Sequence, residues 1–363
     1  MSQAKRLLVM AGGTGGHVFP ALAVAQHLRS QGWQVRWLGT PDRMEARLVP
    51  QYGFDIDYID IQGVRGNGLV RKLAAPFKII KAMLQARRVI KSFKPDVVMG
   101  MGGFASGPGG VAAKWCGVPL VLHEQNALPG LTNKLLSRIA DKVLCAFNGA
   151  FDQVDAQVVG NPVRPELVEL GEQSRLVELP LKLLVVGGSL GARVFNQEVP
   201  GAVAALTAQG IGLTVWHQVG KGNSADVEQA YREKGCAELA QVADFVDDMR
   251  AAYDWADLVL CRSGALTVSE LAAVGKPSLL VPYPHAVDDH QTKNAMVLVN
   301  AGAAKLIAQP DLSQQALVDK ITKMHASPDA LTQMGRAARS VAHLDATTVV
   351  AGVCQQLADR EQS

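Results

Sequence analysis

Short apolar runs alternate along the chain with longer segments in which apolar residues recur every three or four positions. The runs consist mostly of Leu, Val and Ile, which is typical of strands buried on both faces of a parallel sheet. Helical segments between such strands predict an α/β fold. The predicted strands are residues 6–10, 34–38, 97–101, 120–123, 142–145 and 157–159 in a first series, and 181–186, 213–218, 241–245, 258–261 and 278–282 in a second.

The two series predict two Rossmann-like domains. The chain of 363 residues is long enough for two domains of ordinary size. Two prolines and a glycine interrupt the pattern in VVGNPVRPELVEL, so we expect domains of residues 1–163 and 164–342. LLVMAGGTGGHVFPALAV in the first and LLVVGGSLGARVFNQEV in the second each predict a strand, a glycine-rich turn and a helix start. Parallel sheets bind ligands at such turns.

The composition of the chain indicates what kind of partner the protein has and in which cellular compartment it works. Residues 1–95 hold fifteen Lys and Arg against five Asp and Glu, which indicates a negatively charged partner of the first domain. None of the five cysteines forms a C-x-x-C pair, so we expect no disulfide, no zinc site and a cytoplasmic protein. No long apolar signal region is present, and the uncharged stretch 97–113 contains six glycines and a proline. We therefore expect neither export nor a transmembrane helix.

The glycine-rich turns indicate an anionic ligand. Glycine lets backbone N–H groups approach an anion closely, and the start of the following helix carries about half a positive charge. Neither GGTGG nor GGSLG fits the P-loop or the dinucleotide fingerprint, which disfavours a nicotinamide-dependent oxidoreductase. A turn without a ligand would explain either loop alone. Two matched loops, with a third glycine-rich segment GMGGFASGPGG, favour phosphate binding.

The segment CRSGALTVSELAAVGKP, residues 261–277, predicts a helix after a strand. Ser263 is the expected N-cap of this helix and Gly275 its C-terminal cap. Glu270 lies on the helix among apolar residues. It is either a solvated carboxylate or an acceptor for the two hydroxyls of a ribose.

Seven segments together resemble the bacterial peptidoglycan N-acetylglucosaminyltransferases. They run in order between about residues 10 and 295: GGTGGHVFPALAVA, GMGGFASGPGG, LHEQNALPGLTNK, VVGNPVR, VVGGSLGAR, CRSGALTVSELAAVGKPSLLVPYP and DDHQTKNA. The resemblance implies a GT-B fold, in which two Rossmann-like domains with parallel sheets face each other across a deep cleft. It also implies that a terminal helix, about 343–363, packs back on the acceptor-binding first domain, and that the second domain binds the UDP-sugar.

The resemblance implies transfer of N-acetylglucosamine from UDP-N-acetylglucosamine to the C4 hydroxyl of the muramyl sugar of lipid I, undecaprenyl-pyrophosphoryl-MurNAc-pentapeptide. The products would be lipid II and UDP, the reaction would invert C1, and no cofactor or metal would be needed. The enzyme would act at the cytoplasmic face of the bacterial plasma membrane. Other cell-wall synthesis enzymes are further candidate partners. A UDP-sugar epimerase, which shares the architecture and needs no lipid, is the alternative.

The same resemblance implies the residues of the site. The expected contacts of the substrates and their phosphates are Thr14, Gly15, Gly16, Asn126, Arg164, Ser189, Val246, Ala265, Leu266, Thr267, Val268, Ser269, Glu270 and Gln291. Val246 stands where the family often has isoleucine, but its expected contact with uracil is through the main chain.

The acceptor hydroxyl needs a general base. His17 is the first candidate because an imidazole changes charge near neutral pH, and Glu124 is the second. His17 is equally compatible with a hydrogen bond to the acceptor's pyrophosphate. His123 and Glu124 are equally compatible with a structural pair at the end of a strand.

Residues 64–94 hold nine Lys and Arg and no Asp or Glu, with apolar residues at helical spacing. This pattern is typical of a helix lying on an anionic membrane, with a core helix as the alternative. No nucleic-acid-binding motif accompanies the charge, so we expect no nucleic acid partner. The expected membrane-facing residues are Leu73, Phe77, Lys78, Ile80, Lys81 and Leu84.

Overall fold

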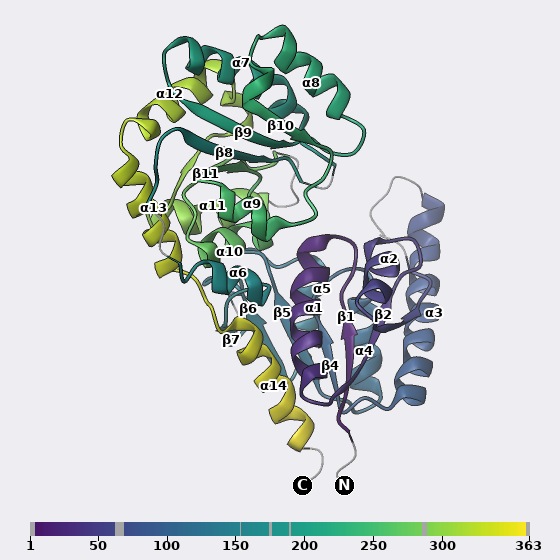
Figure 1. The fold of residues 1–363 in the computed structure, drawn as a ribbon. Helices are drawn as coiled ribbons and strands as arrows, with labels where there is room; N and C mark the ends of the chain where they lie inside the picture. Colours follow the sequence, from purple (N-terminus) through teal and green to yellow (C-terminus); the bar gives the residue numbers. More distant parts are fainter. Residues whose placement is uncertain are drawn as a thin grey trace. The chain divides into compact units, whose positions relative to one another are not determined.

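The computed structural model describes residues 4–61, 69–152, 154–173, 176–188, 190–284 and 289–360, and within 69–74 the backbone alone. The chain divides into two compact units. Unit 1 comprises Met1–Arg164 with His343–Ser363, and unit 2 comprises Pro165–Ala342. Each contains one parallel sheet with helices on its faces (Figure 1).

The sheet of unit 1 has the strand order β3-β2-β1-β4-β5-β6-β7, and all pairs are parallel. Its strands are β1 (Arg6–Met10), β2 (Gln34–Gly39), β3 (Asp55–Tyr58), β4 (Val97–Gly100), β5 (Leu120–Glu124), β6 (Lys142–Cys145) and β7 (Ala156–Val158). Its helices are α1 (Gly15–Ser30), α2 (Met44–Gln51), α3 (Leu69–Phe93), α4 (Ser106–Trp115), α5 (Leu131–Leu136) and α14 (Ala346–Arg360).

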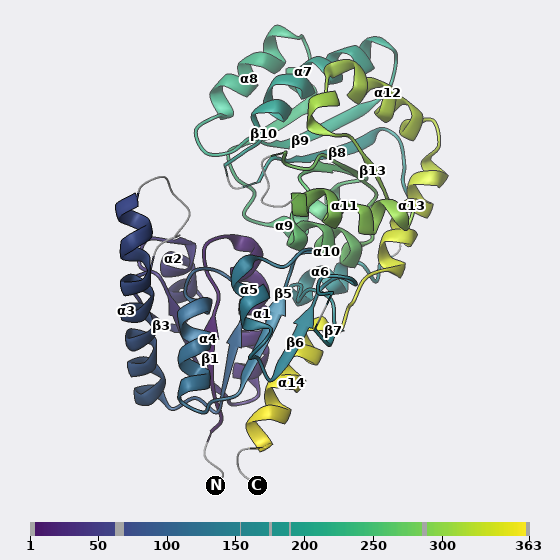
Figure 2. The same ribbon diagram turned by 180° about the vertical axis from the view of Figure 1, so that it is seen from behind.

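The carboxyl-terminal helix α14 belongs to the core of unit 1. It packs against α1 and β4, and Figure 2 shows it on the same side of the sheet as α1. Val350, Cys354 and Leu357 of α14 are buried in one cluster with Leu7 and Val9 of β1. The last helix of the chain therefore completes the apolar layer over the first strand.

The sheet of unit 2 has the order β10-β9-β8-β11-β12-β13, also parallel throughout. Its strands are β8 (Leu181–Val186), β9 (Leu213–Gln218), β10 (Ala240–Ala243), β11 (Leu258–Cys261), β12 (Ser278–Leu280) and β13 (Ala304–Leu306). Its α-helices are α6 (Pro165–Leu170), α7 (Arg193–Ala208), α8 (Ser224–Glu233), α9 (Met249–Trp255), α10 (Ala265–Val274), α11 (His290–Asn300), α12 (Gln314–His325) and α13 (Pro328–Ser340).

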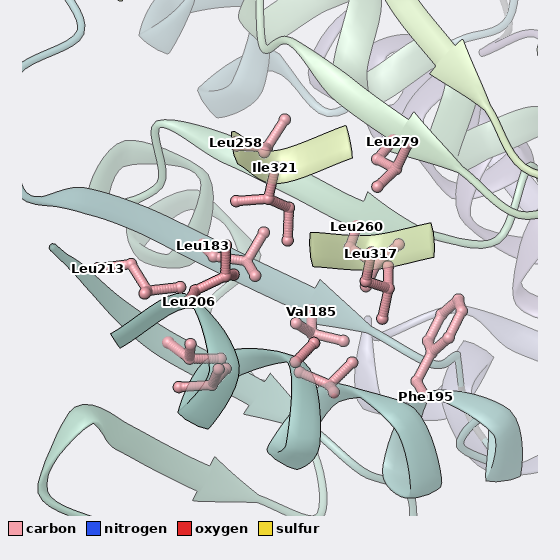
Figure 3. Packing of buried hydrophobic residues seen from close by; sticks show 14 of the residues in the cluster. Leu183, Val185, Phe195, Leu206, Leu213, Leu258, Leu260, Leu279, Leu317 and Ile321 are labelled. Atoms are coloured by element: carbon pink, nitrogen blue, oxygen red, sulfur yellow. The ribbon is translucent and has the colours of Figure 1, made fainter. Parts of the chain in front are cut away.

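Alternate residues of the central strands form the core of unit 2 between the sheet and helices α7 and α12. Figure 3 shows Leu183 and Val185 of β8 facing the same layer as Leu317 and Ile321 of α12. Phe195 of α7, fully buried, closes this layer. Burial of a large apolar side chain stabilises the fold by about 1.5–3 kcal/mol, so this layer is a main source of the stability of unit 2.

In each sheet the order in which successive strands are added reverses at one point. This switch point lies between β1 and β4 in unit 1 and between β8 and β11 in unit 2. In open parallel sheets a ligand binds outside the carboxyl ends of the strands at this point. The glycine loops follow β1, β4 and β8, and the segment leading into α10 follows β11. The topology therefore assembles the predicted binding segments of each unit at its own switch point.

The predicted α/β class with parallel sheets is confirmed, and two strands were missed. β3 reads DIDY and β13 reads AKL, so both edge strands are short and carry charged residues instead of an apolar run. The predicted strand 241–245 is shifted, because β10 spans Ala240–Ala243 and ends before the loop that holds Val246.

Candidate active site

The first glycine loop joins β1 to α1 and packs against the glycine-rich loop after β4. Gly13 has a φ of 92° and Gly103 a φ of 89°. A Cβ atom on Gly103 would lie 2.6 Å from the carbonyl oxygen of Gly12, so the two loops touch through their backbones. Thr14 is the exposed N-cap of α1, and Gly15 and Gly16 form its first turn. A helix leaves the N–H groups of this turn without intrahelical acceptors, which suits an anion.

A buried carboxylate supports this loop from α2. Glu45 is 1% exposed and accepts hydrogen bonds from Gly13 N at 2.8 Å, Thr40 N at 3.1 Å and Thr40 Oγ1 at 2.7 Å. The carboxylate thus ties the glycine loop to the end of β2. Sequence reasoning missed Glu45, since nothing in its local pattern distinguishes it from a solvated acidic residue of a helix.

His17, half-buried in the first turn of α1, contacts the end of β5. Its Nδ1 lies 2.8 Å from Oε1 of Gln125, and Nε2 of Gln125 lies 3.1 Å from both Nδ1 and the carbonyl oxygen of His123. His123 is fully buried, and its Nε2 lies 2.9 Å from the carbonyl oxygen of Gly160. Burial lowers the pKa of His123 to about 4 despite this hydrogen bond. His123 is therefore neutral at physiological pH.

Glu124 organises the loop that follows β5. Its Oε1 accepts hydrogen bonds from N and Nδ2 of Asn126 at 2.9 and 3.1 Å. Its Oε2 accepts from Gly130 N at 3.2 Å and from Asn133 Nδ2 at 2.8 Å. The side chain of Glu124 is 1% exposed, and its four hydrogen bonds hold the loop after β5 in place. Asn126, half-buried, is brought beside it.

Arg164 is the last residue of unit 1 before the chain enters unit 2, and its guanidinium lies 5.8 Å from the ring centroid of Phe19 on α1. This cation–π contact places the guanidinium beside the helix that starts at the first glycine loop. His17 and Arg164 thus lie on, or next to, the same helix.

The second glycine loop, after β8, is held by Gln218 at the end of β9. Gln218 Oε1 accepts a hydrogen bond from Gly188 N at 3.1 Å, while its Nε2 donates to Gly188 O at 3.1 Å and to Asp244 O at 2.9 Å. Gly188 and Gly191 have φ angles of 90° and 76°. Ser189 lies outside the described residues. Val246, 5% exposed, lies two residues beyond Asp244.

Helix α10 begins at Ala265, and its N-cap is Gly264. The predicted N-cap Ser263 is therefore wrong, because the helix starts one residue later, whereas Gly275 does form the left-handed C-terminal cap with a φ of 68°. Ala265 and Val268 are buried, and Leu266, Thr267 and Ser269 are half-buried.

Glu270 is buried at 6% exposure and accepts a hydrogen bond from the hydroxyl of Tyr253 on α9 at 3.2 Å. It is not a solvated carboxylate, so this alternative is wrong. Burial, together with the charge of Glu270, raises the pKa of the neighbouring Cys261 to about 12, so Cys261 stays a thiol.

Gln291, in the first turn of α11, supports the segment after β12. Its Oε1 accepts a hydrogen bond from Tyr283 N at 2.9 Å. On the same helix, Asn294 Nδ2 donates to Ser263 O at 3.3 Å, which ties α11 to the loop before α10. Among the described residues, no group of three or more His, Cys, Asp or Glu is placed to hold a metal ion.

Apolar side chains are exposed along one face of α3. Phe77, Ile80 and Leu84 are 76%, 54% and 43% exposed, and the guanidinium of Arg87 lies 4.7 Å from the ring centroid of Trp115 on the neighbouring α4. Lys78 and Lys81 are also exposed, Lys81 with an ion pair to Asp60 at 2.8 Å. The side chain of Leu73 lies outside the described residues. None of the described helices is long and apolar enough to span a bilayer.

The opposite face of α3 belongs to the core. Ala82, Ala86 and Ile90 are buried together with residues of β1, β4 and α4. The core interpretation therefore holds for this face of α3, whereas membrane contact of the exposed face stays a prediction. We name Phe77, Ile80, Leu84 and Trp115 the α3–α4 surface.

Comparison with known proteins identifies the family. The glycosyltransferase family 28 N-terminal domain matches residues 7–145, and the family's C-terminal domain matches residues 182–349. The chain belongs to glycosyltransferase family 28. The family recognised in the sequence and the predicted GT-B class of fold are thereby confirmed.

The UDP-N-acetylglucosamine--N-acetylmuramyl-(pentapeptide) pyrophosphoryl-undecaprenol N-acetylglucosamine transferase of Shewanella sp. (strain ANA-3) is 68% identical over 357 residues, 98% of each chain. A crystal structure of Acinetobacter baumannii MurG has a TM-score of 0.83 at 44% identity, covering 97% of this chain and 99% of its own. A Neisseria meningitidis UDP-GlcNAc 2-epimerase bound to UDP-GlcNAc has a TM-score of 0.67 at 13% identity, covering 97% and 100%. The epimerase shares the fold alone.

Proposed function

We propose that this family 28 enzyme transfers N-acetylglucosamine from UDP-N-acetylglucosamine to the C4 hydroxyl of the muramyl sugar of lipid I, giving lipid II and UDP. The observation that carries this proposal is 68% identity, over 98% of both chains, with a transferase named for that reaction. The chain is thus a hexosyltransferase of peptidoglycan synthesis.

His17 is the general base of this proposal. The oxygen of the C4 hydroxyl attacks C1 of the donor sugar, the bond from C1 to the diphosphate oxygen breaks, and the hydroxyl proton passes to His17. A direct displacement of this kind inverts C1. Glu124 is less suited to the role, since its two oxygens already accept four hydrogen bonds, three from the loop after β5 and one from Asn133 of α5.

Unit 2 binds the donor in this proposal. The buried carboxylate of Glu270 accepts the ribose hydroxyls, the main chain of Val246 contacts uracil, and Gln291 binds the transferred sugar. The first turn of α10, from Ala265 to Val268, and the second glycine loop with Ser189 stabilise the charge that develops on the departing diphosphate. Arg164, the last residue of unit 1, has the same role. In unit 1, Thr14, Gly15, Gly16 and Asn126 contact the donor and the acceptor.

The enzyme of this proposal also binds a membrane surface, because its acceptor carries a lipid. The α3–α4 surface consists of exposed apolar side chains, and α3 also carries the cations of Lys78, Arg87 and Arg88. No acidic residue lies between Val64 and Lys94. Such a face binds the interface of an anionic bilayer reversibly. We place the enzyme peripherally at the cytoplasmic face of the plasma membrane.

The test measures transfer of radiolabelled N-acetylglucosamine to a short-chain lipid I analogue. The wild-type protein should form the disaccharide lipid. His17→Ala should lower kcat roughly 100-fold or more, whereas Glu270→Ala should chiefly raise the KM for UDP-N-acetylglucosamine. His27→Ala, near the other end of α1, is the control and should behave like the wild type. Epimerisation at C2 of the donor without disaccharide would contradict the proposal and favour an epimerase.

A further inference from the structure

His123, Gln125 and His17 form a chain of hydrogen-bonded side chains. The backbone carbonyl groups of Gly160 and His123 determine where the hydrogens of this chain lie. The carbonyl of Gly160 can only accept, so the Nε2 atom of His123, 2.9 Å away, carries the hydrogen. Because His123 is buried and neutral, its Nδ1 then carries a lone pair. This lone pair faces the side-chain amide of Gln125 at 3.1 Å.

Gln125 has one orientation that satisfies these neighbours. Its amide nitrogen donates one hydrogen to Nδ1 of His123 and the other to the carbonyl oxygen of His123, both at 3.1 Å. A flipped amide would place its oxygen against two acceptors. The oxygen Oε1 of Gln125 therefore faces Nδ1 of His17 at 2.8 Å. Because an amide oxygen can only accept a hydrogen bond, Nδ1 of His17 is the donor.

The ring of His17 is also held in place by its packing. A Cβ atom on Gly102 would lie 2.8 Å from Nδ1 of His17, so the imidazole rests against the bare backbone of the loop after β4. Gly102 has a φ of 92°, which glycine adopts readily. The ring thus has a fixed position as well as a fixed hydrogen-bond partner.

We propose that Gln125 is a positioning residue that holds neutral His17 as the tautomer with its hydrogen on Nδ1, leaving the Nε2 lone pair to take the acceptor's proton. This inference rests on the proposed role of His17 as general base. A neutral histidine has two tautomers, and a base of this kind works only in the one whose lone pair faces the substrate. Gln125 contributes to the reaction through His17 without touching the substrate.

The first test leaves Gln125 unchanged and measures the protonation of His17 directly. The full-length protein, labelled with ¹⁵N in its histidines, is studied by long-range ¹H–¹⁵N correlation at pH 8, and the signals of His17 are assigned by their loss in His17→Ala. The expected result is a protonated Nδ1 and an unprotonated Nε2. A hydrogen on Nε2 of His17 would overturn the proposal.

The second test replaces Gln125 with methionine, which keeps the length of the side chain and removes both polar atoms. We expect mixed tautomers of His17 and a kcat lower by roughly 10- to 100-fold, with an unchanged KM for UDP-N-acetylglucosamine. Gln85→Met is the matched control, since Gln85 accepts a hydrogen bond from Asp60 N in the same unit. It should retain wild-type kinetics.

Two failures can be told apart. Wild-type kcat in Gln125→Met, together with a loss of kcat in His17→Ala, would overturn the positioning role and leave the general base in place. Wild-type kcat in His17→Ala would overturn the base itself, whatever Gln125 does. A merely structural role of Gln125 would lower stability without changing the tautomer of His17, which the NMR measurement detects.

Discussion

The carboxylate of Glu45 accepts a hydrogen bond of 2.8 Å from the backbone N–H of Gly13. This N–H group belongs to the glycine loop that the sequence assigns to an anion, yet its hydrogen is used within the protein. The negative charge of Glu45 also opposes an anion at Gly13 itself. Binding by this loop therefore depends on the groups that follow, at Thr14, Gly15 and Gly16.

Replacing Glu45 with glutamine should destabilise the protein by about 1–3 kcal/mol, because an amide nitrogen would then face an N–H group in a buried site. Thr40→Val, which removes one of the three hydrogen bonds to Glu45, should cost about 1 kcal/mol. Urea unfolding of both variants measures the difference. Equal stability of Glu45→Gln and the wild type would show that the buried carboxylate does not support the loop.

The contact between the two glycine loops of unit 1 makes a second prediction. Gly103→Ala should destabilise the protein by several kcal/mol, since its Cβ would lie 2.6 Å from Gly12 O at a φ of 89°. Gly117 has a φ of 75°, but a Cβ atom there would meet nothing within 4 Å, so Gly117→Ala should cost only about 1–2 kcal/mol. Melting temperatures compare the pair. Similar losses would mean that backbone strain, and not the loop contact, sets the cost.

The α3–α4 surface predicts membrane binding that depends on apolar side chains. Phe77→Ser combined with Ile80→Ser should weaken binding to vesicles containing anionic lipid by roughly tenfold or more, because both side chains lose apolar area in the interface. Activity toward a short-chain acceptor should be retained. The matched control is Leu179→Ser with Val341→Ser, two exposed apolar residues of unit 2. Sedimentation with vesicles measures binding, and equal losses in the two double variants would argue against this surface.

The stability of unit 2 should depend on pH through His217. Burial lowers the pKa of His217 to about 3, whereas an unfolded histidine has a pKa of about 6.5. Between these values the unfolded chain binds a proton that the folded chain does not. Stability therefore falls as the pH drops below about 6.5, and this contribution is absent above that pH.

His217→Gln should reduce this dependence by up to about 1.4 kcal/mol per pH unit between pH 4 and 6. Tyr231→Phe is the control, because it removes the hydroxyl 3.1 Å from His217 Nδ1 and keeps the histidine. Urea unfolding from pH 4 to 8 gives the slopes. An unchanged slope in His217→Gln would show that the histidine is protonated in the folded protein.

Much of the fold was predictable because it is encoded locally. The continuous apolar runs of β1, β8 and β11 have the bounds that the pattern predicts. A buried strand of a parallel sheet needs apolar residues on both faces, so its ends coincide with the ends of the run. The short edge strand β3 has no such run and escaped prediction.

The sequence by itself determined the two α/β halves, the positions of the glycine loops and the family, since each depends on residues close together in the chain. The tertiary structure alone decided which side chains meet. His17 and Gln125 are 108 positions apart, and Gly13 and Glu45 are 32 apart, with no periodic pattern to announce either hydrogen bond. Both pairs form because parallel strands bring the loops at their carboxyl ends to one edge of the sheet.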